Sequence, residues 1–187
     1  MVHEFIVACK DNDLNKIQQM LHMVDIPMNE GFISACGYGQ IDVIKYLVPL
    51  GVDIHTRDEE GFIWACSNGK IDVVKYLVLL GVDIHARDEK GFIWACEYGH
   101  IAVVRYLVEN TNVNIHTRAD YGFRYACCYG QIDVIRYFVN FMQCVKYRKL
   151  DKISQIIPNI NYKRTNVTTY LINVGRYMNH LNNNFIL

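Results

Sequence analysis

The sequence predicts an all-α protein, an α-solenoid in which short helix-turn-helix repeats stack side by side and are joined by short turns. The first observation is the segment from Gly61 to Cys66, Gly-Phe-Ile-Trp-Ala-Cys, which returns unchanged thirty residues later from Gly91 to Cys96. The second is that each copy leads to a glycine and then to an apolar run with helical spacing. A helix pair of this size cannot bury its apolar face alone, so neighbouring copies must share one core.

Diverged copies of this segment extend the pattern toward both ends of the chain. One begins at Gly31, another at Gly122, and a shorter one at Phe5. We therefore predict a degenerate N-terminal capping repeat over residues 4–30, repeats over 31–60, 61–90 and 91–121, a C-terminal repeat with a degenerate helical unit over 122–157, and an asparagine-rich tail over 158–187. The tail has one candidate cap helix near residues 170–181, and the alternative is a flexible or partner-binding tail.

Each repeat is predicted to contain two helices. The first runs from a phenylalanine such as Phe62 to the residue before a glycine such as Gly69, which can adopt a left-handed backbone and end the helix. The second runs from Ile71 to Val78, and its broad apolar face can contact both the first helix and the neighbouring repeat. The alanine of the repeated segment, Ala65, is predicted to lie where two helices touch and a large side chain would not fit.

The run from Gly69 to Asp88 resembles the second helix and hairpin of an ankyrin repeat. The resemblance covers residues 4–139 in register, although the period is 30 residues instead of about 33 and Gly-Phe-Ile-Trp replaces the usual Thr-Pro-Leu-His. In its short period the chain is similar to the ankyrin families of giant DNA viruses that infect amoebae, and its many Ile, Asn and Tyr residues fit an AT-rich source. The resemblance implies a solenoid whose hairpin tips and first helices form a concave, protein-binding groove.

Charge is distributed unevenly along a chain whose formal net charge is zero. Residues 1–139 carry 12 basic and 18 acidic side chains, whereas residues 140–187 carry 7 basic and 1 acidic. No apolar run approaches the roughly 18 residues that a membrane span requires, and the N-terminal apolar run is too short for a secretory signal. We therefore expect a monomeric, intracellular protein, in the host cytoplasm or nucleus if the chain is viral, with no membrane partner.

Two ladders of potential metal ligands follow the repeat period, but their spacing argues against a metal site. Packed helices lie about 8–10 Å apart and zinc holds its ligands at about 2.0–2.3 Å, so equivalent residues of adjacent repeats cannot share an ion. We interpret the cysteines as reduced core residues, with an exposed Cys128, and the histidines as turn-stabilising, a pH-sensitive surface being the alternative. The ladders are Cys9, Cys36, Cys66, Cys96 and Cys127, and His55, His85 and His116. Because no catalytic or phosphate-binding motif is present, we expect no enzyme activity, cofactor or metal.

The candidate binding residues lie at first-helix positions that differ between repeats while the core positions hardly change. Several of them are Trp or Tyr, the residues most enriched at binding hot spots. We predict a groove lined by Tyr38, Trp64, Asn68, Trp94, Glu97, Tyr98, Tyr125 and Tyr129, with solvated acidic tips at Glu59, Glu60, Glu89 and Asp120. The alternative is that Trp64 and Trp94 pack between repeats and never meet solvent.

These features predict a protein–protein interaction scaffold or adaptor, whose partner is a host protein if the viral resemblance holds. The acidic repeats suggest that this partner carries a basic or mixed patch. The alternative is a nucleic-acid-associated protein that uses the basic C-terminal segment, because phosphate contacts require Lys and Arg. Six of the seven basic residues of that segment gather near Tyr147 and Tyr162, namely Lys146, Arg148, Lys149, Lys152, Lys163 and Arg164.

Overall fold

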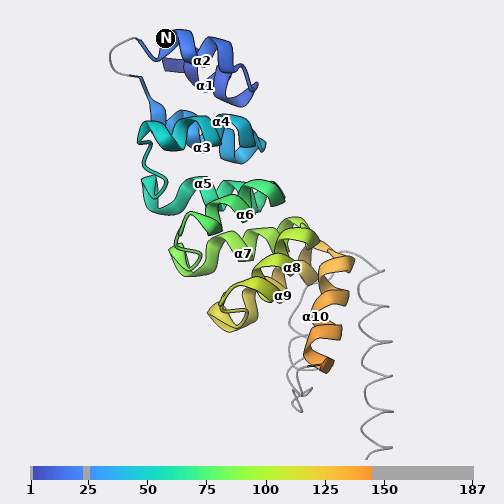
Figure 1. Ribbon diagram of the computed structural model, residues 1–187. Helices are drawn as coiled ribbons and strands as arrows, with labels where there is room; N and C mark the ends of the chain where they lie inside the picture. Colours follow the sequence, from blue (N-terminus) through green and yellow to red (C-terminus); the bar gives the residue numbers. More distant parts are fainter. Residues whose placement is uncertain (1, 23–25, 145–187) are drawn as a thin grey trace, which may run out of the picture.

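The computed structural model describes residues 2–22 and 26–144, which form helices and turns without a strand (Figure 1). The helices are α1 (Val2–Lys10), α2 (Leu14–Met20), α3 (Met28–Tyr38), α4 (Ile41–Leu47), the 3-10 turn η1 (Val48–Leu50), α5 (Thr56–Ser67), α6 (Ile71–Leu79), α7 (Ala86–Tyr98), α8 (Ile101–Asn110), α9 (Thr117–Tyr129) and α10 (Ile132–Cys144). The predicted degenerate unit and candidate cap helix, and the basic residues from Lys146 onward, lie outside the described residues beyond the end of α10.

The helix pairs stack in chain order, from α1 and α2 at one end to α9 and α10 at the other (Figure 1). The first helices of the pairs, α1, α3, α5, α7 and α9, pack against one another in series. Each second helix packs on the back of its own first helix, and α6, α8 and α10 also contact one another in series. This is the predicted all-α solenoid, and the prediction is confirmed.

The repeated Gly-Phe dipeptide is explained by the contact between adjacent first helices. Phe32 is fully buried, and its ring lies against the backbone of Gly61 in the next repeat. A Cβ at Gly61 would lie 2.9 Å from Phe32 Cε1 and 3.2 Å from Cys36 Sγ, closer than side chains tolerate. The glycine therefore makes room for the preceding repeat's phenylalanine and cysteine, and Gly31, Gly91 and Gly122 do the same.

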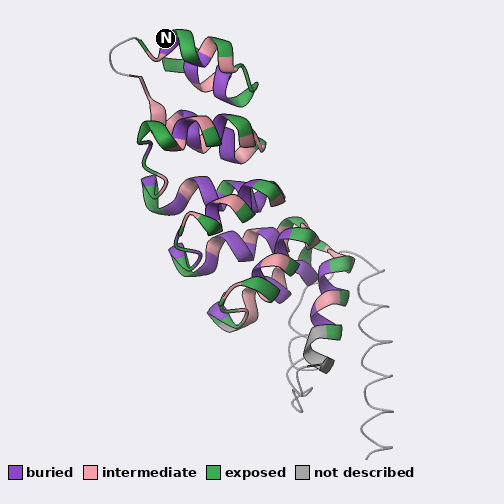
Figure 2. Ribbon diagram, in the orientation of Figure 1, coloured by how far each residue is buried: buried purple, intermediate pink, exposed green. Residues whose placement is uncertain are grey.

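The core runs continuously through the stack and is built from the same positions in every repeat (Figure 2). In α6 the buried residues are Val73, Val74 and Leu77, whereas Lys75 on the same helix is exposed. Ala65 is fully buried, as predicted. The α6 pattern is the one expected of a helix that covers its partner on one side and faces water on the other.

The turns between the paired helices end as the sequence predicts. Gly39 has φ +86° and Gly99 has φ +81°, the left-handed conformation that closes a helix without steric cost for glycine. The amide of Gly39 donates to the carbonyl oxygens of Ala35 and Cys36, which would otherwise lack an intrahelical partner. The next helix, α4, begins two residues later at Ile41.

The turns that enter the first helices differ from the prediction. Arg57, Asp58 and Glu59 have φ of +51°, +53° and +63°, so three successive residues adopt a left-handed turn before the right-handed helix of α5 continues from Glu60. The same turn precedes the right-handed part of α7. The predicted helix start at the phenylalanine is therefore too late, and in the repeat before it α3 already begins at Met28. Left-handed backbone costs non-glycine residues roughly 1–2 kcal/mol each, so side-chain contacts at these tips must offset a strain.

Candidate protein-binding groove

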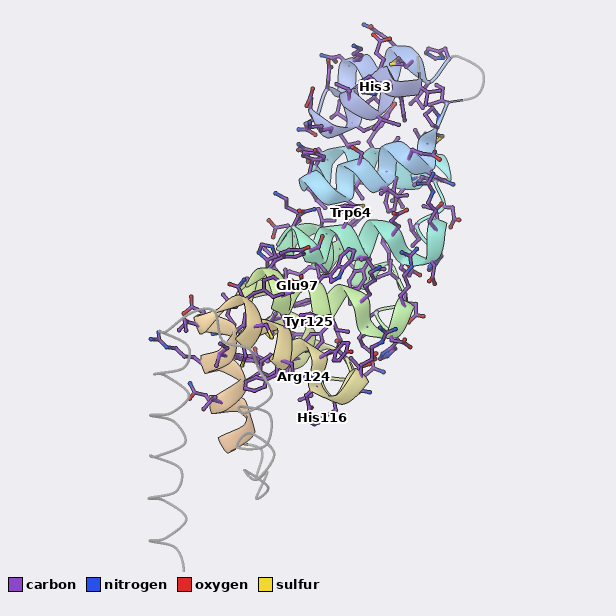
Figure 3. The ribbon with its side chains drawn as sticks, turned by 180° about the vertical axis from the view of Figure 1, so that it is seen from behind. His3, Trp64, Glu97, His116, Arg124 and Tyr125 are labelled. Carbon is purple, nitrogen blue, oxygen red and sulfur yellow. The ribbon has the colours of Figure 1, made fainter. Side chains whose placement is uncertain are left out.

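The predicted aromatic residues share one exposed side of the first helices, which we call the inner groove. Tyr38, Tyr98 and Tyr129 are exposed, whereas Trp94 and Tyr125 are half-buried. Trp64 is 42% exposed, so the alternative in which both tryptophans stay away from solvent is wrong for Trp64. Figure 3 shows Trp64, Glu97 and Tyr125 in order along the stack.

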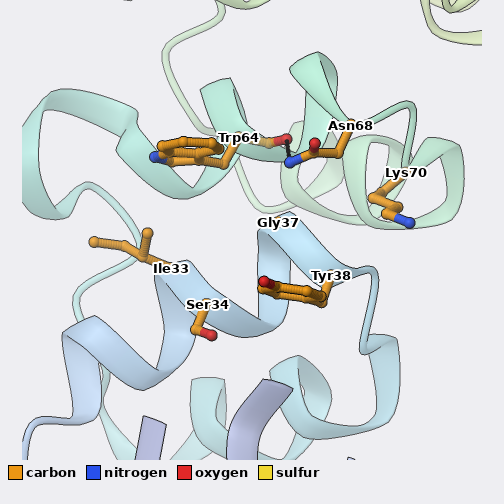
Figure 4. Close-up of a pocket in the computed structure, with 7 residues that line it drawn as sticks. All are labelled: Ile33, Ser34, Gly37, Tyr38, Trp64, Asn68 and Lys70. Carbon is orange, nitrogen blue, oxygen red and sulfur yellow. Dashed lines mark hydrogen bonds between the residues drawn. The ribbon is translucent and has the colours of Figure 1, made fainter. Parts of the chain in front are cut away.

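The first of two hollows in the inner groove lies between α3 and α5 (Figure 4). It has a volume of about 450 Å³. Gly37 leaves its floor open, and the ring of Trp64 on α5 lies across from Ile33 and Ser34 on α3. Asn68 lies between Trp64 and Lys70 and donates from Nδ2 to the Trp64 carbonyl oxygen at 3.0 Å. The lining residues are Ile33, Ser34, Gly37, Tyr38, Trp64, Asn68 and Lys70.

The second hollow lies one repeat further along, between α5 and α7, and has a volume of about 400 Å³. Trp64 lines both hollows, and its ring meets that of Trp94 edge-on with the centroids 6.3 Å apart. On α9 the rings of Tyr125 and Tyr129 continue the aromatic row, 6.2 Å apart. The lining residues of the second hollow are Trp64, Ser67, Asn68, Trp94, Tyr98 and His100.

Polar contacts hold the groove's aromatic rings in fixed orientations. Trp64 Nε1 donates to Glu60 Oε1 at 3.3 Å, and Glu60 Oε2 lies 3.5 Å from Arg57 Nη1. The Lys90 ammonium lies 4.4 Å from the centre of the Trp94 ring, within the range of a cation–π interaction. Since these contacts exist before any partner binds, the rings need little reordering on association.

The acidic tips are where the prediction is wrong. Glu59 and Glu89 are only 4% and 7% exposed, so they are not the solvated carboxylates that the sequence indicated. Glu59 Oε1 accepts hydrogen bonds from His55 Nδ1 at 2.6 Å and from the amide of Asp83 in the next repeat at 3.1 Å. These bonds turn the carboxylate inward and stabilise the left-handed turn. Neither glutamate can serve as an exposed contact.

The histidine ladder stabilises these turns, as interpreted from the sequence. His85 Nδ1 donates to Glu89 at 2.8 Å, and His116 Nδ1 donates to Asp120 at 2.5 Å. The Asp120 side chain is only 15% exposed, so the predicted tip at Asp120 is also largely covered. For His55, the hydrogen bond with Glu59 raises the pKa of the imidazole above its ordinary value of 6.5.

The acidic side chains that do reach solvent at the tips are paired with arginines of the following repeat. Arg87 Nε donates to Asp58 Oδ2 at 3.1 Å, and Arg118 Nη2 donates to Asp88 Oδ2 at 2.5 Å. This ladder was missed by sequence reasoning, although the repeat period places each arginine in register with the aspartate of the repeat before. Exposed pairs stabilise little, about 0–1 kcal/mol each, but they remove much of the expected negative charge from the tips.

The buried cysteines are core residues, as predicted. Burial raises the pKa of the Cys9 and Cys127 thiols to about 12, so they stay protonated and unreactive. Cys128 is exposed, which confirms the prediction for that thiol. Within residues 2–22 and 26–144, no three His, Cys, Asp or Glu side chains converge as metal ligands. Across the same residues, no helix combines the length and apolar character that crossing a membrane requires.

Helix pairs stacked in series, with an open aromatic groove along the first helices, define a helical-repeat protein. The family model for ankyrin repeats in three copies matches the chain twice, over residues 5–88 and 62–149. The chain therefore belongs to the ankyrin-repeat family, whose members are generally protein–protein interaction modules and typically non-enzymatic. No curated protein matches the chain significantly.

Proposed function

We propose that this chain is a non-enzymatic scaffold or adaptor that binds a segment of a partner protein in its inner groove. The observation that carries the proposal is the placement of Trp64, which is exposed, held by Glu60, and shared by two adjacent hollows. A side chain with this position is available to a ligand on both sides. Fixed, partly exposed Trp and Tyr rings are the usual centres of binding energy at protein interfaces.

The variation between repeats supports the same proposal. Ser34 occupies the position on α3 that Trp64 occupies on α5 and Trp94 on α7, and this small residue leaves the first hollow open. The core residues around it are repeated almost without change. Core packing thus explains the residues that recur in every repeat. Contact with a ligand would explain the groove residues that differ between repeats.

The finer expectations rest on the sequence. The similarity of the short period to ankyrin families of giant DNA viruses favours a host protein as the partner and an intracellular, monomeric adaptor. The nucleic-acid alternative rests on the charge of residues 140–187, which fall almost wholly outside the described residues. We keep a protein as the proposed partner because the groove itself is described.

The proposal is tested by selecting random dodecapeptides displayed on phage against the full chain and measuring the affinity of selected peptides by calorimetry. Trp64→Ala removes the shared wall, and we expect it to weaken binding at least 30-fold, the effect of a hot-spot residue. Ser34→Trp should also abolish binding by filling the first hollow. It is compatible with the fold, because tryptophan already stands at that position in the next two repeats.

The matched control is Lys75→Gln on the exposed side of α6, away from the groove, which should leave the affinity unchanged. Circular dichroism confirms that every variant is folded. If no dodecapeptide is selected, or if selected peptides bind Trp64→Ala and Ser34→Trp as tightly as the original chain, the groove is not the binding site.

A further inference from the structure

The charges around the two hollows are opposite in sign to the net charge of the repeats. Lys70 lines the first hollow, and the lining of neither hollow includes a carboxylate. Two further ammonium groups lie on the groove's aromatic rings: Lys10 Nζ is 4.7 Å from the centre of the Tyr38 ring, and Lys90 Nζ lies over Trp94. The rims of both hollows are therefore cationic.

No described carboxylate neutralises these lysines. In the part of the chain that the structure describes, Lys10, Lys70 and Lys90 form no ion pair with a carboxylate. The carboxylates of the groove are already engaged. Glu60 accepts from Trp64 and pairs with Arg57, while Glu97 interacts with the Tyr129 hydroxyl and thereby raises the pKa of Tyr129.

The acidic side chains that make residues 1–139 negative lie elsewhere. Those at the tips are buried or paired with arginines, and others are exposed on the second helices of the pairs, at Asp42, Asp72, Glu109 and Asp133. Because salt limits interactions between exposed charges to about 8 Å at physiological ionic strength, a ligand in the groove responds to the lysines around it. The net charge of the whole array has little effect there.

Lys70 is held in place by its aliphatic stem. The stem packs over Gly39, where a Cβ would lie 2.9 Å from Lys70 Cδ, so the side chain crosses to the rim of the hollow on the preceding repeat. Two of the equivalent positions carry Gln40 and Gln131, whose side-chain amides donate to main-chain oxygens of the repeat before. The fold thus accepts an uncharged residue here, and it does not require the charge of Lys70.

We propose that the segment bound in the inner groove is acidic, with an aspartate or glutamate beside Lys70 and an apolar side chain in the hollow between Tyr38 and Trp64. The proposal rests on the function proposed above and specifies the partner's chemistry. It replaces the expectation of a partner with a basic or mixed patch, which rested on the net charge of the repeats alone. Ile33 and the two aromatic rings favour the apolar side chain, and the unpaired ammonium favours the carboxylate next to it.

A single-stranded nucleic acid could also stack on aromatic rings, but it requires a positive groove that follows its phosphates continuously. Here Glu60 beside Trp64 and Glu97 beside Tyr129 lie among the cations, so the positive charge is not continuous along the groove. Separate carboxylates of a peptide can meet separate lysines without facing these acids. The arrangement therefore favours an acidic peptide.

The experiment starts from the dodecapeptides selected above, whose composition is compared with that of the unselected library. We expect enrichment of Asp and Glu and depletion of Lys and Arg. For one selected peptide, each carboxylate is then changed to its amide, and both peptides are titrated against the original chain, Lys70→Gln and the control Lys75→Gln. Removing either the peptide carboxylate or the Lys70 ammonium should weaken the binding of the peptide about twofold to fivefold, the range of an exposed ion pair.

The double-mutant cycle separates a direct pair from a general loss of affinity. Lys70→Gln should weaken the acidic peptide and leave its amide version unchanged, and raised salt should remove the difference. Selected peptides rich in Lys and Arg, or a cycle without coupling, would overturn the proposal while Trp64-dependent binding still upheld the proposed function. Tighter binding of oligothymidylate, sensitive to Lys70→Gln and Trp64→Ala, would overturn it in favour of nucleic acid.

Discussion

The inner groove and the opposite, outer face of the stack carry the same kinds of residue but in different arrangements. On the outer face, formed by the exposed sides of α4, α6, α8 and α10, each lysine or arginine lies over the tyrosine of the next repeat. Lys45 lies 5.9 Å from the Tyr76 ring, Lys75 lies 5.9 Å from the Tyr106 ring, and Arg105 lies 5.7 Å from the Tyr137 ring. On the groove side, by contrast, one and the same position of the first helices is occupied by Ser34, Trp64, Trp94 and Tyr125 in successive repeats.

Both faces are hollowed, so a hollow alone does not distinguish them. The outer face has one of about 420 Å³ between α6 and α8, and it is lined by residues such as Lys75, Arg105 and Tyr106 that the neighbouring repeats also supply. There, the cation–ring contacts between neighbours account for the residues present. In the groove, Trp64 and Lys70 replace Ser34 and Gln40 of the repeat before, so the repeated framework does not require either residue. The difference shows that departures from the repeat are better guides to function than exposure.

Two substitutions two residues apart on α5 test most directly whether the groove residue Trp64 is separate from the core framework. Phe62 is 1% exposed and belongs to the repeated core, so Phe62→Ala should lower the free energy of unfolding by about 3–5 kcal/mol. Trp64→Ala removes a side chain that is not part of the buried core and should cost far less. Urea denaturation followed by circular dichroism measures both. Equal losses would mean that Trp64 is a framework residue and not a groove residue.

The next largest effect is expected from adding volume to the contact between helices. Ala65 is fully buried, so Ala65→Leu should destabilise the fold by about 1–3 kcal/mol through overpacking. The control is Asn68→Tyr, three residues further on the groove side, where Tyr38 and Tyr98 show that the fold accepts a tyrosine. Thermal melting of both variants provides the measurement. An unchanged melting temperature for Ala65→Leu would place this alanine outside the tightly packed contact.

The sequence predicted the solenoid and its core because both follow from a period that recurs with little change. The repeated alanine was predicted to lie at a helix contact, and Ala65 is fully buried. The exposed tyrosines and Trp64 were also predictable, since helical spacing assigns them to one face. These predictions needed only local pattern and periodicity.

The burial of Glu59 and the position of Lys70 could not be predicted in this way. The stretch Arg57 to Glu60 is wholly charged and carries no glycine to indicate a left-handed turn, so it reads as a solvated loop. Its conformation depends on bonds to His55 and to Asp83 of the next repeat, which only the stacked structure reveals. Lys70 likewise reaches the groove only because Gly39 of the preceding repeat leaves room for its stem.

The smallest expected effect is on the pH dependence of stability, through the pair of His55 and Glu59 in the left-handed turn. It tests whether this turn belongs to the repeated framework. Glu59 Oε2 is buried and has no hydrogen-bond partner among the described residues, so the carboxylate is stabilised through Oε1, which bonds to His55 and to the Asp83 amide. The bond to Glu59 raises the pKa of His55 above 6.5, with further support from the charges of Asp53 and Asp83.

A histidine whose pKa is raised on folding stabilises the folded state fully below its unfolded pKa, and it loses that contribution as pH rises through the folded value. The free energy of unfolding should therefore decline from pH 6.5 upward, and less so in His55→Gln. The decline should be small, because the His55 side chain is 56% exposed and water screens the pair. Urea denaturation across this range and an NMR titration of the imidazole provide the two measurements. A His55 resonance that titrates below pH 6.5, or identical pH profiles for the two proteins, would show that the imidazole only fills space at the tip.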